Sequence, residues 1–200
     1  PPRPPFCDVR TPEYAVFPDV RRDKWESVRG MDKSFGYNRA SRPEDFLSRE
    51  DLLQGFADIV SKNGNLLLNV GPRGEDAAIP EPQRERLRWL GSFLARAGEA
   101  VYGTRPWRRA EGRTDGGLPV RFTAKGDDVF ALVLGTPAPP GAVRLPDAPV
   151  AGLREVELLG HGSLDHAVQG GGLEIASGAP WPEAPVQALA LRGAGREEGS

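Results

Sequence analysis

The chain has 200 residues, of which 38% are hydrophobic and 27% charged, a composition typical of a globular protein with one large or two small domains. Its 26 basic and 28 acidic residues leave a formal net charge of −2, so neither a nucleic acid nor an anionic membrane is expected as a partner. No apolar run approaches the roughly 20 residues that span a bilayer, which also argues against a membrane partner.

Cysteine and histidine are too few to suggest redox or metal chemistry. Cys7 is the single cysteine, so no intrachain disulfide can form, and no partner pattern marks it as a nucleophile. The two histidines, His161 and His166, lie late in a Gly-rich region. We therefore expect no metal site and no cofactor. The chain begins without methionine or a signal peptide, as if in the middle of a longer protein, and its compartment and oligomeric state are not predicted.

The first quarter of the chain is rich in loops and leads into a helix. Short strands are expected at Glu13–Val16 and Ser34–Tyr37. Ser48 fits a helix N-cap, and the apolar residues after it recur at helical spacing. Asn63-Gly64 is a suitable end for that helix, because both residues tolerate the left-handed conformation.

A strand and a second helix follow. The apolar run within Asn65–Gly71 is typical of a strand covered on both faces, as in a parallel sheet. Pro80 and Pro82 suit the first turn of a helix that ends near Gly98. Helix, strand and helix in this order predict an α/β unit.

Beyond Trp107 the pattern changes to short strands separated by Gly- and Pro-rich turns. Such a series without helices predicts an antiparallel β-sandwich. The expected strands are Val120–Ala124, Asp128–Leu134, Ala142–Leu145, Glu155–Leu159, Leu173–Ala176 and Gln187–Leu191. The expected domains are therefore residues 1–106 and 107–192, with residues 193–200 as a disordered tail.

Three sets of motifs carry a family resemblance. They are Arg10-Thr-Pro-Glu-Tyr14 with Trp25-Glu26 and Ser34–Asn38, then Asp58–Pro72, then Ile79-Pro80 with Gly98–Trp107. In this order and spacing, over about residues 8–107, the chain resembles the retaining α-L-fucosidases of glycoside hydrolase family 29. The later strands fit the C-terminal β-sandwich of that family only by architecture.

The resemblance implies an α/β region that is the C-terminal part of a (β/α)8-like barrel, followed by an all-β antiparallel β-sandwich. The family's aspartate nucleophile and its sugar-binding histidines would lie upstream of this chain. The chain would then be a fragment of an enzyme that removes α-linked L-fucose from fucosylated glycans, and would be inactive by itself.

Glu13 is the candidate acid/base, because Thr11-Pro-Glu-Tyr14 matches the family motif that carries this residue. Retaining hydrolysis needs one carboxylate as nucleophile and a second carboxyl group that first donates and then accepts a proton. Pro12 and Tyr14 would restrict Glu13 and partly shield it from water. Taken without the family match, Glu13 reads as an ordinary solvated carboxylate, and Glu26 is its rival in this chain.

Two aromatic residues are candidates for substrate binding. Phe35 matches the family's aromatic that packs against the fucose methyl group, where an apolar wall would disfavour sugars with a 6-hydroxyl. Trp25 could line the cleft or serve as an interior anchor, since aromatic rings do both. Asn69 and Gly71, at the end of the expected strand, are interpreted as structural support.

Two other functions are compatible with the sequence. The chain could be a non-catalytic carbohydrate-binding or accessory module, in which the sandwich binds the sugar. It could also belong to an inactive fucosidase-like scaffold. An aspartate nucleophile on an upstream barrel strand would favour the enzyme over both.

Overall fold

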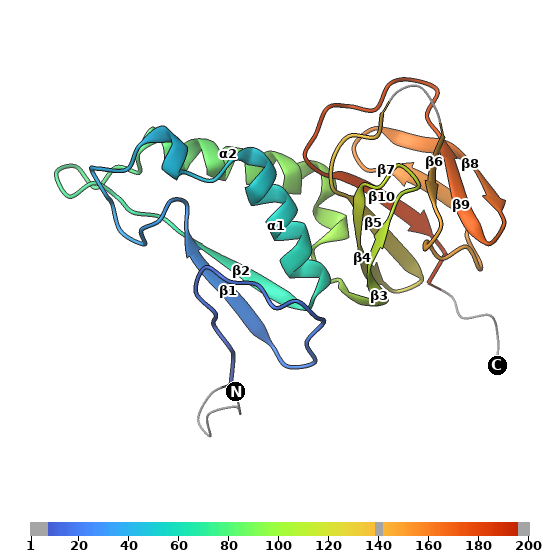
Figure 1. The fold of residues 1–200 in the computed structure, drawn as a ribbon, viewed down its shortest axis with the longest axis horizontal. Helices are drawn as coiled ribbons and strands as arrows, with labels where there is room; N and C mark the ends of the chain where they lie inside the picture. The colour runs from blue at the N-terminus through green and yellow to red at the C-terminus, as the bar shows by residue number, and fades with distance from the viewer. Residues whose placement is uncertain (1–7, 139–141, 196–200) are drawn as a thin grey trace. The chain divides into compact units, whose positions relative to one another are not determined.

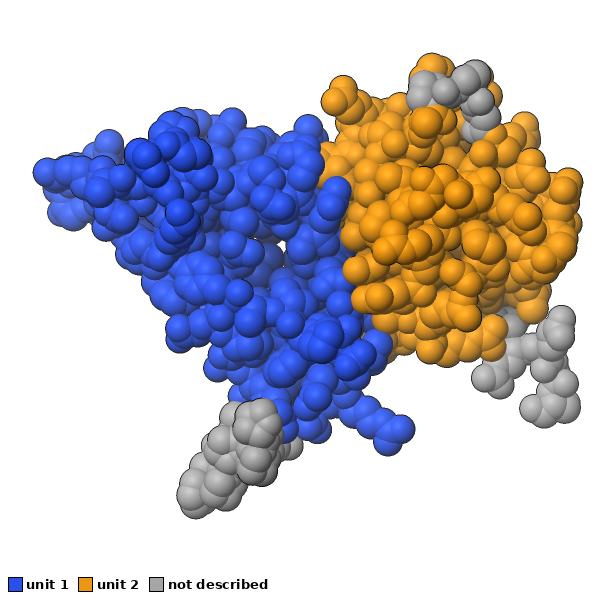
Figure 2. Space-filling view, in the orientation of Figure 1, with its two compact units in different colours: residues 1–92 blue, residues 93–200 orange. Residues whose placement is uncertain are grey.

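The computed structural model describes residues 8–138 and 142–195 and divides into two compact units. Figure 2 colours the N-terminal unit, residues 1–92, and the C-terminal unit, residues 93–200. The domain boundary expected at residues 106/107 stays a prediction, and Cys7 lies outside the described residues.

The N-terminal unit is built on a βαβ arrangement. Strand β1 (Trp25–Gly30) and strand β2 (Gly64–Asn69) pair in parallel, and helix α1 (Arg49–Ser61) connects them after the short 3-10 helix η1 (Pro43–Asp45) (Figure 1). Helix α2 (Glu81–Ala97) follows β2. The parallel sheet expected from the sequence is confirmed, although β1 was not among the expected strands.

The segment before β1 adds a third parallel stretch of backbone. Arg10 bridges Trp25 and Glu13 bridges Val28, both in parallel. The Glu26 amide donates to the Arg10 carbonyl at 2.8 Å, and the Tyr14 amide donates to the Val28 carbonyl at 2.9 Å. Pairing thus ends at Glu13, where the sequence suggested that a strand begins. Residues 34–37, all of them described, do not form the expected strand; residues 35 and 36 lie in a bend.

The limits of α1 agree with the sequence signals. The Ser48 hydroxyl accepts a hydrogen bond from the Asp51 amide at 3.0 Å, which satisfies one of the free amides of the first turn. Asn63 has a φ of 68° and ends the helix in the left-handed conformation. Both predictions are confirmed.

One face of the parallel sheet is covered by α1 and the other is open. Ser27 and Leu66 line a small cavity together with Leu52 and Phe56 of α1. Leu67, whose side chain points to the opposite face, is 44% exposed. The expectation of a strand covered on both faces is therefore wrong for this chain, because the described residues supply a helix to one face only.

The C-terminal unit contains the 3-10 helix η2 (Gly98–Ala100) and an eight-stranded antiparallel sheet. In the sheet the strand order is β3-β4-β5-β10-β7-β8-β9-β6. The strands are β3 (Arg105–Arg113), β4 (Pro119–Lys125), β5 (Asp128–Val133), β6 (Ala142–Leu145), β7 (Glu155–Leu158), β8 (Gly162–Gln169), β9 (Gly172–Ala176) and β10 (Gln187–Arg192). Six match expected strands, whereas β3 and β8 were not expected.

This sheet is continuous and curls over one core. Strand β8 pairs with β7 as far as Leu164 and with β9 from Asp165, so it passes from one part of the sheet to the other. The Asp115 amide, in the turn after β3, donates to the Arg144 carbonyl of β6 at 3.0 Å. These contacts link the two ends of the strand order. The antiparallel pairing is confirmed, but the strands form one curled sheet instead of two separate layers.

The core of the C-terminal unit is closed. Every residue of Val129–Val133 is fully buried, as are Leu189 and Leu191 of the neighbouring strand. Phe122, 1% exposed, packs on the same cluster and lies 5.2 Å from the Trp107 ring.

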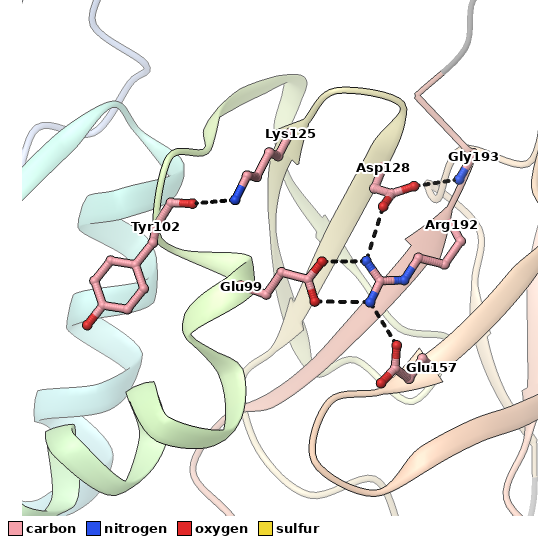
Figure 3. Close-up of polar contacts among 7 residues, drawn as sticks. All are labelled: Glu99, Tyr102, Lys125, Asp128, Glu157, Arg192 and Gly193. Atoms are coloured by element: carbon pink, nitrogen blue, oxygen red, sulfur yellow. Dashed lines mark hydrogen bonds and ion pairs between the residues drawn. The ribbon is translucent and has the colours of Figure 1, made fainter.

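Arg192, at the end of β10, joins three elements of the C-terminal unit (Figure 3). Its guanidinium contacts Glu99 at 2.6 Å, Glu157 at 2.8 Å and Asp128 at 3.1 Å. These three carboxylates come from η2, β7 and β5. The hydrogen bonds, chiefly from Glu99, raise the pKa of Arg192, and the same contact lowers the pKa of Glu99.

The residues directly after β10 are held in place. The Gly193 amide donates to Asp128 at 2.8 Å, and the Gly195 amide donates to the Asp127 carbonyl at 2.8 Å. A disordered tail is therefore not seen for residues 193–195, and residues 196–200 lie outside the described part of the chain.

Candidate active site

Glu13 lies at the carboxyl end of the first parallel segment. Its partner Val28 pairs in turn with Leu67, and paired residues of parallel strands share a face. Glu13 is thus on the open face of the sheet, and it is exposed, so the shielding expected from its neighbours is not present in this chain. Enzyme sites on parallel sheets form at the carboxyl ends of the strands, and Glu13 is placed accordingly.

Tyr14 turns the chain away from the sheet directly after Glu13. Its φ of 50° is in the left-handed region, which is unusual for a bulky residue. The Tyr14 hydroxyl accepts a hydrogen bond from the Gly30 amide, with an N–O distance of 3.2 Å. The end of the Glu13 segment is therefore tied to the end of β1.

Phe35 lies in the loop that follows β1, and its ring is 5.0 Å from the Tyr14 ring at an angle of 59°. The Asn69 side-chain amide, at the end of β2, donates to the Phe35 carbonyl. A side chain at Gly71 would overlap the backbone of Gly36, so the loop and the end of β2 pack closely. The structural role read for Asn69 and Gly71 agrees with these contacts.

A buried carboxylate, which the sequence analysis did not single out, fixes the same loop. Asp32 is 5% exposed and accepts hydrogen bonds from the Ser34 amide at 2.8 Å and the Ser41 hydroxyl at 2.6 Å. An aspartate that bonds the amide two residues later is a recognised turn signal, so Asp32-Lys-Ser34 could have indicated this turn.

Further along the chain, the partly buried carboxylate of Asp45 accepts two hydrogen bonds. Asp45 accepts from the Arg42 backbone amide at 3.0 Å and from the Lys33 ammonium at 2.9 Å. The Arg42 hydrogen bond, followed by that from Lys33, lowers the pKa of Asp45 to about 2. Asp45 therefore stays ionised at any pH near neutral.

Glu26 is on the same open face as Glu13 but further from the carboxyl ends of the strands. It precedes Val28, the partner of Glu13, by two residues, which corresponds to roughly 6–7 Å along a strand. Its side chain is partly buried. Of the two carboxylates, Glu13 is the one that lies beside Tyr14 and the Phe35 loop.

Trp25 is in the interior at the opposite end of β1. It is 1% exposed, its indole N–H donates to the Lys62 carbonyl at 3.0 Å, and its ring meets Phe17 edge-on at 5.1 Å. A side chain at Gly64 would overlap the indole. These contacts support the interpretation of Trp25 as an interior anchor, and Trp25 is not part of the site proposed below.

Residues 8–138 and 142–195 contain neither a cluster of metal ligands nor a membrane-spanning helix. No group of three or more Cys, His, Asp and Glu side chains is placed to hold a metal ion. No helix in this part of the chain is both long and apolar enough to cross a membrane.

Comparison with known proteins gives one consistent result. A family model described as alpha-L-fucosidase matches residues 4–99. The chain belongs to the α-L-fucosidase family. The alpha-L-fucosidase of Branchiostoma floridae is 39% identical over 119 residues, 59% of this chain and 26% of that protein. The plasma alpha-L-fucosidase of Rattus norvegicus is 41% identical over 145 residues, 70% of this chain and 30% of that protein.

Solved α-L-fucosidase structures agree. The Thermotoga maritima alpha-fucosidase in complex with a mechanism-based inhibitor superposes with a TM-score of 0.81 at 37% identity, over 94% of this chain and 43% of that one. The alpha-L-fucosidase isoenzyme 1 of Paenibacillus thiaminolyticus, at 24% identity and a TM-score of 0.77, shares the fold over 92% of this chain and 45% of that one. The chain thus spans less than half the length of these α-L-fucosidases.

Proposed function

We propose that this chain forms the C-terminal part of a retaining α-L-fucosidase, in which Glu13 is the acid/base and Phe35 contacts the fucose methyl group. One observation carries the proposal: Tyr14, next to Glu13 in the chain, packs its ring on Phe35 at 5.0 Å. Two residues that are 22 positions apart, each matched to a family role, therefore lie at one end of the parallel strands.

The proposed reaction has two steps with opposite proton transfers. In the first, an upstream aspartate attacks the anomeric carbon while the carboxylic acid of Glu13 gives its proton to the departing glycosidic oxygen. In the second, water attacks the same carbon, its proton passes to the Glu13 carboxylate, and the bond to the aspartate breaks. The aspartate would come from chain that precedes these 200 residues.

The open face of the N-terminal unit fits a larger barrel. The backbone of residues 10–13, β1 and β2 are consecutive parallel stretches, and a helical crossover joins β1 to β2, as in a (β/α)8 barrel. The remaining strands would cover the face on which Leu67 and Glu13 are exposed. They would also exclude water from Glu13, as the carboxylic acid of such a site requires.

The decisive experiment uses Glu13→Ala in the complete enzyme that carries this chain. With an aryl fucoside that has a good leaving group, the first step should continue and the second should lose its base. Turnover should fall by roughly 10²–10⁴, the usual contribution of a positioned acid/base. A covalent fucosyl-enzyme should accumulate, and azide, which needs no deprotonation, should restore turnover and give the β-fucosyl azide.

Glu26→Ala is the matched control, because it removes a carboxylate from the same face of the same sheet. The turnover of Glu26→Ala should not depend on azide. Its pH profile should keep the alkaline limb, which Glu13→Ala should lose. Near-normal turnover of Glu13→Ala, or azide rescue of Glu26→Ala instead, would show that Glu13 is not the acid/base. A complete wild-type protein that forms no fucosyl-enzyme would support the inactive scaffold.

A further inference from the structure

We infer that Tyr14 is a positioning residue that sets Glu13 and Phe35 together, so that acid/base catalysis and discrimination at the sugar's 6-position depend on one side chain. This inference rests on the proposed function and extends it to a residue to which the family match gave no role. It is carried by the backbone conformation, the hydroxyl contact and the ring contact of Tyr14.

The backbone of Tyr14 is held in a conformation that its own side chain disfavours. A φ of 50° is rare for a large residue, and such a conformation persists only where the surroundings fix it. The Tyr14 amide, bonded to the Val28 carbonyl at 2.9 Å, supplies part of that restraint. The bend begins at the residue after Glu13, so it determines where the Glu13 strand ends and the direction in which the chain leaves.

The hydroxyl supplies a second restraint at the end of β1. It accepts the Gly30 amide at 3.2 Å, and a side chain at Gly30 would lie 2.9 Å from that hydroxyl and overlap the Ser34 carbonyl. There is thus no space for the Tyr14 side chain to shift toward β1. The Arg29 guanidinium, 5.8 Å from the ring centre, lies over the same ring.

The ring completes the connection to the loop after β1. Asn69 and Asp32 hold the backbone of that loop, through the Phe35 carbonyl and the Ser34 amide. Neither contact fixes the Phe35 ring itself. The aromatic contact with Tyr14 at 5.0 Å does so, and tilted ring pairs at this distance are favourable.

These three contacts predict that two substitutions separate the effect on acid catalysis from the effect on discrimination at the sugar's 6-position. Tyr14→Phe keeps the ring on Phe35 but loses the acceptor for Gly30, so it should weaken acid catalysis while discrimination stays as in the wild type. Tyr14→Gly tolerates the positive φ but loses the whole side chain, so both properties should change.

The test is made in the complete enzyme with α-L-fucosides of good and poor leaving groups and with the matching α-L-galactoside. Misplacement of an acid matters most when the leaving group needs a proton. Tyr14→Gly should therefore lose about 10²-fold in kcat/KM on an alkyl fucoside, the cost of an ångström-scale displacement, and about 10-fold or less on a nitrophenyl fucoside.

Discrimination is measured as the ratio of kcat/KM for fucoside and galactoside. Phe35→Ala should lower this ratio by roughly 10-fold or more, the usual range for one methyl-sized contact in an apolar pocket. Tyr14→Gly should lower it in the same direction, and the double variant should fall little further than Phe35→Ala. Tyr102→Phe, which removes an exposed hydroxyl from the C-terminal unit, is the control and should change neither quantity.

The outcomes separate this inference from the proposed function. A complete wild-type enzyme without fucosidase activity would overturn both. An active wild type in which Tyr14→Gly loses equally on both leaving groups, with an unchanged ratio, would overturn the inference alone. Melting temperatures of all variants are recorded, and the leaving-group dependence is compared only among folded proteins, for which Tyr14→Phe is the conservative member.

Discussion

The two units of the chain differ in how far their sheets bury apolar side chains. In the C-terminal unit, Val129, Ala131 and Val133 are fully buried in the core of a curled antiparallel sheet. In the N-terminal unit, the parallel sheet has one face packed on α1, and on the other face Leu67 is 44% exposed.

The difference follows from how each sheet is connected. Antiparallel strands pair through short turns, so a stretch of about 100 residues can bury its own core. A parallel barrel buries its interior only when strands from distant parts of the chain are present. The proposed site residue Glu13 is in the unit whose parallel sheet has an open face, and the closed core belongs to the unit without a proposed catalytic role.

The largest effect is expected in amide hydrogen exchange of this 200-residue chain. Amides of β5 and β10 should exchange only on global unfolding of their unit, whereas amides of β2 should exchange orders of magnitude faster through local opening. Exchange measured by NMR or mass spectrometry would show this. Equal protection of β2 and β10, with one sharp melt of a monomer, would mean that the N-terminal unit is stable without further strands.

The next effect compares one truncation in each unit. Phe122→Ala should lower the free energy of unfolding of the C-terminal unit by about 3–5 kcal/mol, because it leaves a cavity in a closed core. Leu67→Ala should change the free energy of unfolding of the N-terminal unit by about 0.5 kcal/mol or less, because Leu67 is 44% exposed and lies on the open face. Denaturant titration measures both. A large cost at Leu67 would indicate that its face is covered in solution.

The smallest effect concerns Arg192 and its three carboxylates. Arg192→Met should lower the unfolding free energy of the C-terminal unit by about 1–2 kcal/mol at neutral pH, since partly exposed ion pairs contribute roughly 0.2–1 kcal/mol each. Arg113→Met, which removes another guanidinium from the same unit, is the control and should be near neutral.

The pH dependence of this difference has a definite sign. Because the folded protein lowers the pKa of Glu99 below its ordinary value of 4.5, the ion pair stabilises the fold above that pH. The contribution is lost as the pH falls through the lowered pKa. The gap between wild type and Arg192→Met should therefore be constant from pH 7 to about 5 and shrink in more acidic solution. A gap independent of pH down to 2 would contradict this account.

Local signals in the sequence predicted elements where one residue determines the backbone. Ser48 and Asn63 set the limits of α1 through a side-chain cap and a left-handed end, and both act within a few residues. Strands with continuous apolar residues, such as β5 and β10, were also predicted. Neighbouring strands bury the side chains of β5 and β10, but the apolar pattern is visible within each segment alone.

The strands that were missed have a polar face. Trp25–Gly30 and Gly162–Gln169 alternate or expose their side chains, and Arg105–Arg113 is rich in arginine, so none forms an apolar run. Whether such a segment becomes a strand is determined by its neighbours in space. Glu13 and Phe35 were chosen only through the family resemblance, and neither the strained φ of Tyr14 nor its contact with Phe35 could be read from residue types.

The interior position of Trp25 also makes the N-terminal unit optically distinguishable. An indole away from water emits at shorter wavelength than a solvated one, and Trp25 and Trp181 are 1% and 6% exposed in the two different units. With Trp89 and Trp107 replaced, each unit would carry one buried indole. If either Trp25 or Trp181 is then also replaced, the fluorescence of the remaining indole reports the unfolding of its own unit. Comparison of the two single-tryptophan variants gives the order in which the two units melt.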